Sequence, residues 1–173
     1  MKRIFYISLI GSFIILLDQL TKAGIQDNYF LGESKVIIDG FFNLTYVKNK
    51  GAAFGMGADS PDWLRSILFL YLPVGACFYL LQLVWSSRNH KNWISCWAYG
   101  LIFAGAVGNL IDRFMLGYVV DFLDFYFKGS HFPAFNVADS SISIAAGLLI
   151  LDLILENKRK DPKENSEKNE VPS

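Results

Sequence analysis

Two aspartates in apolar surroundings are the residues of this sequence best suited to chemistry. Asp139 stands near the start of the last apolar run, and Asp121 stands in the aromatic segment before that run. A carboxylate in hydrocarbon costs on the order of several kcal/mol or changes its protonation, so Asp139 needs a partner. On a helix, Asn136, Asp139 and Ser140 share one face. Asp121 is the nearest carboxylate that a folded-back linker can bring over that face.

Two carboxylates in one site supply acid–base chemistry. They do not both ionise readily, so one of them keeps its proton near neutral pH. Such a pair provides a general base that activates water and a general acid for the leaving amine, as in aspartic peptidases. The pair titrates as a unit, so the sequence does not say which of Asp121 and Asp139 holds the proton. The sequence has no Gly-x-Ser-x-Gly, Cys/His pair, His-Glu-x-x-His or phosphate-binding glycine loop.

Two other function classes remain open for these carboxylates. A small proton-coupled or cation-coupled transporter is the main alternative, because carboxylates also bind protons and cations. Transporters usually place their site near the bilayer midplane and often contain repeats, whereas this sequence shows no internal repeat. A structural membrane protein without chemistry is the third hypothesis. Flux in liposomes would indicate the transporter, and peptide cleavage would indicate the peptidase.

The elements that must position these residues are membrane spans. Of the 173 residues, 53% are hydrophobic and 18% are charged, whereas soluble proteins average roughly 25% charged. The formal net charge is zero, so no basic field suggests nucleic acid as a partner. We therefore predict an all-α integral membrane domain over residues 1–156 and a polar, disordered cytoplasmic tail over 157–173. The four transmembrane helices are expected at about 4–22, 64–85, 93–112 and 136–155.

The segments between the spans differ from them in composition. Residues 28–60 alternate β-branched and aromatic residues with turn-forming Asp39-Gly40, which predicts a small β-structured loop at the membrane surface. Pro73 is expected to kink the second span. The linker 114–134 is aromatic, and we interpret its part 122–127 as a loop that forms a lid over the site.

Basic residues in the short segments predict the topology. Lys2, Arg3, Arg88, Lys91 and the basic run at 158–160 fall on one side of four spans, and that side should be cytoplasmic. Four lysines fall on the other side, so the bias is modest. We expect both termini in the cytoplasm and the first run to be an uncleaved span, since no small-x-small cleavage site follows it.

With this topology the polar clusters gather at the outer surface, and each also has a structural interpretation. Asp18 and Lys22 have the spacing of an ion pair on one helix. The stretch from Asn49 through Gly51 could be tight loop packing, and Asp112-Arg113 could bridge two helices. Asn136 could be only a helix N-cap. Asp152, on the inner half of the last span, is interpreted as an interfacial residue.

The cysteines and histidines predict no metal centre. Cys77 and Cys96 lie in separate apolar runs and are expected to be packing residues. His90 and His131 stand alone in polar linkers without a nearby ligand partner. We therefore expect neither a metal nor a cofactor.

Five motifs in order across the four spans resemble the lipoprotein signal peptidases, also called signal peptidase II, a family of bacterial membrane aspartic peptidases. They are Asp18-x-x-Thr21-Lys22, Asn49-x-Gly51-Ala52-Ala53-Phe54, Gly108-Asn109-x-x-Asp112-Arg113, Val120-Asp121-Phe122 and Phe135-Asn136-x-Ala138-Asp139-Ser140. The resemblance runs from about residue 4 to residue 156. It implies a four-helix membrane enzyme with an extracytoplasmic β-cradle and a short helix in the second outer loop.

The same resemblance implies roles for the residues of the motifs. Asp121 and Asp139 would be the catalytic pair, in an active site at the extracytoplasmic face of the bacterial inner membrane. The substrate would be a prolipoprotein with a diacylglyceryl group on its lipobox cysteine, cut just before that cysteine by a monomeric enzyme among membrane lipids. Substrate-binding and supporting roles would fall to Asn49, Asn109, Arg113 and Asn136. Structural roles near the site would fall to Asp18, Lys22, Gly51 and Asp112.

Overall fold

The computed structural model describes residues 2–51, 56–57, 60–87 and 93–168, with side chains through residue 157. Three expectations therefore fall outside the described residues. They concern Ala52–Phe54 of the second motif, the linker residues Arg88, His90 and Lys91, and the side chains of the basic run at 158–160.

Four helical stretches are long and apolar enough to cross a membrane, as the sequence predicts. Each extends beyond its expected bounds. The elements are α1 (Lys2–Asn28), the continuous α2 (Asp62–Ser66), η2 (Ile67–Tyr71) and α3 (Leu72–Ser87), then α4 (Trp93–Leu116) and α5 (Val137–Lys168). The apolar span of α5 ends at Asn157. The α5 helix continues into the polar tail as far as Lys168.

The second span, in which a kink at Pro73 is predicted, contains a π-helical turn. The π-helix η2 lies directly before Pro73 in the second span. Proline has no N–H to donate to the carbonyl four residues back, and its ring crowds that carbonyl. A local widening of the helix relieves this conflict without breaking the span.

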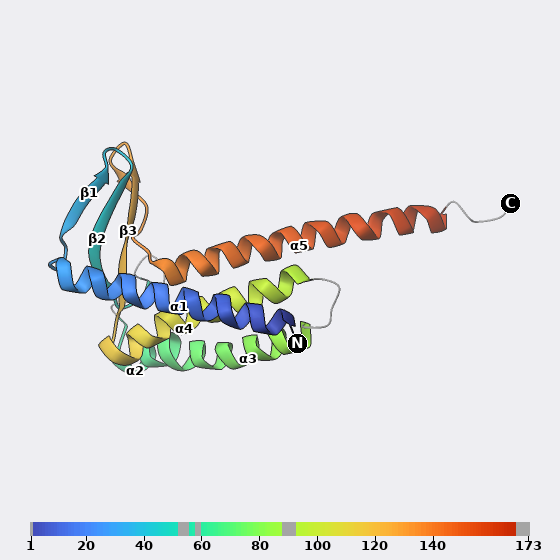
Figure 1. The fold of residues 1–173 in the computed structure, drawn as a ribbon, viewed down its shortest axis with the longest axis horizontal. Helices are drawn as coiled ribbons and strands as arrows, with labels where there is room; N and C mark the ends of the chain where they lie inside the picture. Colours follow the sequence, from blue (N-terminus) through green and yellow to red (C-terminus); the bar gives the residue numbers. More distant parts are fainter. Residues whose placement is uncertain (1, 52–55, 58–59, 88–92, 169–173) are drawn as a thin grey trace.

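A four-stranded antiparallel sheet stands at one end of the helices, beside the end of α1 and the start of α5 (Figure 1). Its strands in order are β1 (Ser34–Ile38), β2 (Phe42–Asn49), β3 (Val119–Phe127) and β4 (Ser130–His131). The hairpin β1–β2 confirms the β-structure predicted for residues 28–60. Its turn uses Gly40 at a φ of 71°, a left-handed conformation that favours glycine.

The short helix expected in the second outer loop is absent: within residues 117–136 the structure contains β3, β4 and connecting turns. The interpretation of 122–127 as a loop is also wrong, because these residues belong to β3, whereas their role as a lid stays a prediction. Val, Phe and Tyr favour strands, and β2 offers β3 a complete antiparallel partner from Phe42↔Phe125 to Asn49↔Val119. The β-cradle therefore takes strands from both outer loops.

The sheet is attached to the helices through a small apolar core. Ile25 of α1 packs with Tyr46 of β2 and with Val120 and Phe122 of β3. This core fixes β3 over the end of α1, and β3 carries Asp121.

The helix α4 packs against α1, α3 and α5. Glycines allow the closest of these approaches. A Cβ on Gly105 would lie 2.5 Å from the carbonyl oxygen of Ala138, and one on Gly108 would lie 2.8 Å from Oδ2 of Asp18. The first turn of α5 therefore lies directly against the backbone of α4 at Gly105.

Asp152, predicted to lie at the membrane interface, takes part in the contact between α4 and α5. Its side chain is buried, and Ser95 of α4 donates its hydroxyl to Asp152 Oδ2. A buried carboxylate needs such a donor, so this pair joins α4 and α5 at the end of the helices away from the sheet.

Candidate active site

The two aspartates singled out from the sequence line the same pocket. Asp121 lies on β3 and Asp139 lies in the first turn of α5. The pocket has a volume of about 330 Å³, and its other lining residues are Asn49, Asn109, Arg113, Val119, Phe132, Pro133, Ala134, Ile142 and Ser143. The structure thus brings together every residue predicted to bind substrate or support the pair except Asn136, which lies directly beneath it.

Asn136 connects the two carboxyl groups. Its Nδ2 donates a hydrogen bond to Asp121 Oδ1 across 2.8 Å, and its Oδ1 accepts one from the backbone N–H of Asp139 across 2.9 Å. Its own backbone N–H donates to Asp139 Oδ2 across 3.3 Å. This reciprocal pattern is a helix cap, so the predicted cap is confirmed. The same side chain also fixes the position of Asp121 relative to α5.

The second oxygen of Asp121 accepts a hydrogen bond from Asn49. The distance from Asn49 Nδ2 to Asp121 Oδ2 is 3.0 Å, and Asn49 Oδ1 in turn accepts from the backbone N–H of Gly51 across 2.9 Å. The Asp121 side chain is buried. Burial, followed by the negative charge of Asp139, raises the pKa of Asp121 to about 7. At neutral pH this carboxyl group is therefore close to half protonated.

Asn109 holds the other aspartate. Its Nδ2 donates to Asp139 Oδ1 across 2.8 Å. Its Oδ1 accepts from Lys22 Nζ across 3.0 Å and from Asn136 Nδ2 across 3.2 Å. These two donors leave Asn109 only one orientation of its amide, with Nδ2 directed at the carboxylate.

Beneath the pocket lies a fully buried charge cluster. Lys22 Nζ lies 2.8 Å from Asp18 Oδ2 and 3.0 Å from Asp112 Oδ2, which confirms the predicted Asp18–Lys22 ion pair. Both carboxylates also accept backbone hydrogen bonds, Asp18 from Ala138 and Asp112 from Val120. The cluster therefore ties α1 and α4 to β3 and α5, close to Asp121 and Asp139 in the chain.

Sequence reasoning missed one member of this cluster, Gln19. Its Nε2 donates to the carboxylates of Asp18 and Asp112 and to the carbonyl of Gly108. A glutamine one position after Asp18 in an apolar run was the available signal, because a buried amide needs partners in lipid just as a charge does.

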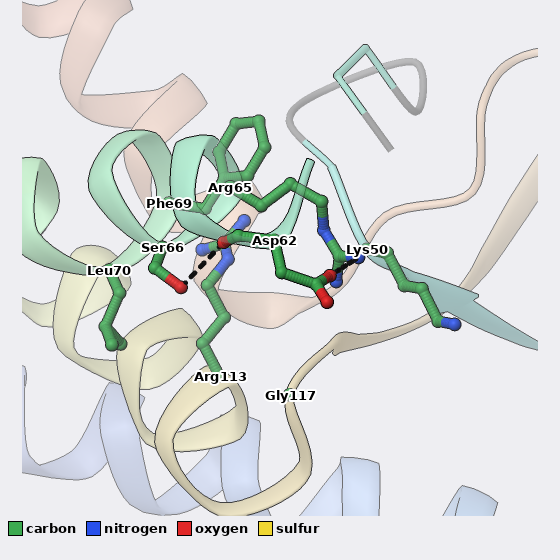
Figure 2. A pocket seen from close by; sticks show the side chains of 8 residues that line it. All are labelled: Lys50, Asp62, Arg65, Ser66, Phe69, Leu70, Arg113 and Gly117. Atoms are coloured by element: carbon green, nitrogen blue, oxygen red, sulfur yellow. Dashed lines mark hydrogen bonds and ion pairs between the residues drawn. The ribbon is translucent and has the colours of Figure 1, made fainter. Parts of the chain in front are cut away.

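Arg113 lines both the pocket of Asp121 and Asp139 and a second pocket. Its Nη2 donates to the carbonyl of Gly51 across 3.1 Å, and its guanidinium carbon lies 5.8 Å from the ring centre of Phe69. Figure 2 shows Arg113 directed from α4 towards the α2–η2 segment. The second pocket, of about 220 Å³, is also lined by Lys50, Asp62, Arg65, Ser66, Phe69, Leu70 and Gly117. It contains neither Asp121 nor Asp139, so it is not the site of the carboxyl pair.

No group of three or more His, Cys, Asp and Glu side chains that could hold a metal ion occurs within the described ranges. His131, interpreted from the sequence as isolated, instead contacts Asp124 with its Nδ1 at 2.9 Å. The signal that could have found this contact is the Lys128-Gly129 turn. Both residues have positive φ, 49° and 79°, and the turn folds β4 back onto β3.

The site is thus arranged for acid–base chemistry, because two carboxyl groups share one pocket and each is held by carboxamide donors. The family model described as Signal peptidase (SPase) II matches residues 10–155 of this chain. The chain belongs to the signal peptidase II family. It is thus an aspartic peptidase, and its four apolar helices with a small antiparallel sheet are the fold that carries this activity.

Relatives of this signal peptidase II occur in several bacteria. A lipoprotein signal peptidase of Shewanella piezotolerans is 48% identical over 146 residues, which is 84% of each chain. One of Syntrophus aciditrophicus is 42% identical over 147 residues, covering 85% of this chain and 91% of the relative. The resemblance drawn from the five motifs is confirmed.

Two solved structures share the fold of this signal peptidase II. One, described as a bacterial membrane enzyme determined in meso at 2.3 Å, has a TM-score of 0.78 and 34% identity. It covers 98% of this chain, and this chain covers 95% of it. A second, described in the same way at 1.9 Å, has a TM-score of 0.72 and 37% identity, with 87% and 93% covered. This chain is therefore a multi-pass bacterial membrane protein.

Proposed function

We propose that this signal peptidase II removes signal peptides from prolipoproteins whose lipobox cysteine carries a diacylglyceryl group, cutting the peptide bond before that cysteine. The observation that carries the proposal is the sharing of one pocket by Asp121 and Asp139, with Asn136 bonded to both. The relatives' name, lipoprotein signal peptidase, supports the class of substrate.

Asp121 and Asp139 act as the catalytic pair. The ionised carboxylate takes a proton from a water molecule, and the oxygen of that water adds to the scissile carbonyl carbon. The protonated carboxyl group then donates its proton to the nitrogen that leaves as the amine. These reaction steps start from a pair that shares one proton. A pKa of about 7 for Asp121 makes this state available at neutral pH.

The supporting residues hold the pair in position and face the substrate. Asn49 and Asn109 each donate to one carboxyl group, so they fix its rotation. Arg113 lines the pocket while its Nη2 is held by the Gly51 carbonyl. Its remaining N–H groups are placed to donate to a substrate backbone carbonyl.

The pocket faces the extracytoplasmic side, and both termini lie in the cytoplasm, with the polar segment after Asn157 as a cytoplasmic tail. Lys2 and Arg3 lie at the end of α1 away from the sheet, which supports this orientation under the positive-inside rule. A diacylglyceryl-cysteine holds its scissile bond at the membrane surface, where the sheet and the pocket lie. The residues assigned to the site all come from one chain, so one copy is enough to form the site, and we propose a monomeric enzyme.

Purified Asp121→Asn and Asp139→Asn proteins test this proposal. Each is expected to lower the rate of cleavage of a lipidated prolipoprotein by at least about 10³-fold, because the general acid–base pair is broken. Asp39→Asn is the matched control, since Asp39 is an exposed carboxylate in the β1–β2 turn. Near-normal turnover by either pair variant would show the assignment to be wrong. Equal cleavage of the same precursor without its lipid would refute the requirement for a diacylglyceryl group.

A further inference from the structure

Asp124 joins three strands of the sheet through its buried carboxylate. Asn43 of β2 donates from Nδ2 to Asp124 Oδ2 across 2.9 Å. His131 of β4 places Nδ1 at 2.9 Å and 3.0 Å from the two oxygens of Asp124. The His131 ring also stacks on Tyr126 of β3, with ring centres 5.0 Å apart and planes 10° from parallel. We call Asn43, Asp124 and His131 the strand clamp.

The strand clamp lies on the opposite face of β3 from the catalytic pair. Successive side chains of a strand point to opposite faces, so Asp124 and Asp121, three residues apart, face opposite ways. The register shift in this region falls in β2, between Leu44 and Val47, and leaves β3 regular. The strand clamp therefore makes no contact with the carboxyl group of Asp121.

The strand clamp is nevertheless connected to the pocket through the chain that follows β4. The next three residues, Phe132, Pro133 and Ala134, line the catalytic pocket. Only two residue pairs join β3 to β4, namely Tyr126↔His131 and Phe127↔Ser130. Beyond them, the backbone N–H groups of Phe132 and Phe135 bond to the carbonyls of Phe125 and Leu123. Phe135 also pairs with Leu123, and its carbonyl accepts from the backbone N–H groups of Phe122 and Leu123. Residues 132–134 are thus bonded to β3 at both ends, and the His131–Asp124 contact is the side-chain link at the β4 end.

The energetics of Asn43 argue that the strand clamp is more than packing. Asn43 Oδ1 is buried without a hydrogen-bond partner in the described part of the chain. An unsatisfied buried oxygen costs about 1–3 kcal/mol, and an apolar cross-strand pair at Asn43↔Asp124 would avoid that cost. The amide is kept with Nδ2 directed at Asp124, so the carboxylate has donors from both neighbouring strands. The hydrogen bonds therefore fix the position of the Asp124 carboxylate at some cost to the stability of the fold.

We propose that Asp124 and His131 are positioning residues for substrate binding: they hold residues 132–134 as a fixed wall of the catalytic pocket. This inference rests on the proposed function for its kinetic consequence. Because Asn49 and Asn109 hold the two carboxyl groups from other segments, loosening the wall weakens substrate binding more than it slows the chemical step.

Steady-state kinetics of His131→Ala on a lipidated prolipoprotein test the proposal. KM is expected to rise about five- to twenty-fold, with kcat within about two-fold of the wild type. His131→Asn keeps an N–H near the position of Nδ1 and should restore most of the wild-type KM. Ser130→Ala, at the exposed neighbouring position in β4, is the matched control and should change neither constant.

Hydrogen exchange separates this inference from the proposed function, because it needs no activity. In His131→Ala, the amides of Phe132 and Phe135 should exchange at least about tenfold faster, with the amides of α4 unchanged. An unchanged KM with unchanged exchange would overturn the proposal. So would a fall in kcat and thermal stability that His131→Asn fails to restore, since the strand clamp would then be structural only. If no prolipoprotein is cleaved by the wild type, the proposed function fails, and the exchange experiment alone decides whether the strand clamp holds the wall.

Discussion

Lys22 on the first helix donates a hydrogen bond across 3.0 Å to Asn109 Oδ1 on α4, and Asn109 Nδ2 in turn donates one to Asp139. A fully buried ammonium group is thereby connected to the catalytic pocket through one carboxamide. The ion pairs that balance it, to Asp18 and Asp112, lie on the far side of the amide from the pocket. The charge cluster and the catalytic pair are therefore one hydrogen-bonded unit.

We expect Lys22→Met to destabilise the protein by about 3–5 kcal/mol, because it leaves two buried carboxylates without their cation. Chemical denaturation in detergent micelles measures this change. Lys35→Met, at an exposed position on β1, is the control and should have little effect. Adding Asp112→Asn to Lys22→Met should recover part of the loss. A loss below about 1 kcal/mol for Lys22→Met would contradict the role given to the cluster.

Removing the carboxamide of Asn136 should lower kcat rather than raise KM. Asn136→Ala deletes the donor to Asp121 and the acceptor for the N–H of Asp139. A hydrogen bond to a charged group contributes about 1.5–3 kcal/mol, which corresponds to a fall in kcat of roughly 10- to 150-fold. Ser140→Ala removes only a bond to the Asn136 carbonyl and is the control. Equal kinetics for the two variants would argue against the connection described for Asn136.

Cleavage should decline on the alkaline side of neutrality. With a pKa of about 7 for Asp121, raised by burial and by Asp139, the pair loses its shared proton as the pH rises above that value. We expect kcat/KM to fall about tenfold for each pH unit above pH 8, since the general acid is then absent. Initial rates measured in mixed buffers of constant ionic strength test this. A flat profile between about pH 6 and pH 9 would be incompatible with a shared proton.

The same pKa has a consequence for stability. The pKa of Asp121 is raised from 3.8 to about 7 in the folded protein, so the folded state binds this proton more tightly than the unfolded state. The resulting stabilisation is complete below about pH 3.8 and is lost as the pH rises towards 7. As the pH rises across this range, the wild type should lose stability that Asp121→Asn does not lose. The melting temperature of Asp121→Asn should therefore increase relative to that of the wild type. A constant difference would mean that Asp121 titrates normally.

The contact between α4 and α5 tolerates no added methyl group. A Cβ at Gly105 would lie 2.5 Å from the Ala138 carbonyl, one residue before Asp139. We expect Gly105→Ala to cost about 1–3 kcal/mol and to lower activity by displacing the start of α5. Gly147→Ala is the matched control: its Cβ meets nothing within 4 Å, and it should be neutral or stabilising by roughly 0.5–1 kcal/mol. Melting curves of the two variants measure the contrast.

Much of the fold could be predicted because the bilayer leaves few choices. Long apolar runs have to become spanning helices, and a charge such as Asp18 in such a run has to be paired, here by Lys22 at the next turn. The pocket could be predicted only as a gathering of polar residues at one surface. That Asp121 and Asp139 meet there followed from the resemblance, because no periodicity relates a strand residue to a helix start.

The errors came from segments whose partner lies far away in the chain. The strand over 119–127 is hard to predict because apolar residues on both faces mask its alternation, and its partner β2 lies about 70 to 80 positions earlier. The His131–Asp124 contact is the exception, because the two residues are only seven positions apart and the Lys128-Gly129 turn between them is a local signal. The contact of Asp152 with Ser95 is not predicted because the two residues are 57 positions apart. The β2–β3 pairing and the Ser95–Asp152 contact are pairings that local sequence does not encode.

The buried ion pair of α1 also bears on how the protein is made. Asp18 and Lys22 emerge from the ribosome together and neutralise each other within one helix, so α1 can enter the bilayer before any other span exists. Asp112, Asp121 and Asp139 follow only later in translation, and Asp139 opens the last span. A chain interrupted before α5 has one carboxyl group of the pair and no acid–base partner for it. With Asp121 and Asp139 in their proposed catalytic roles, the peptidase becomes active only when its final helix has been inserted, and no partly synthesised copy can cut a membrane protein beside it.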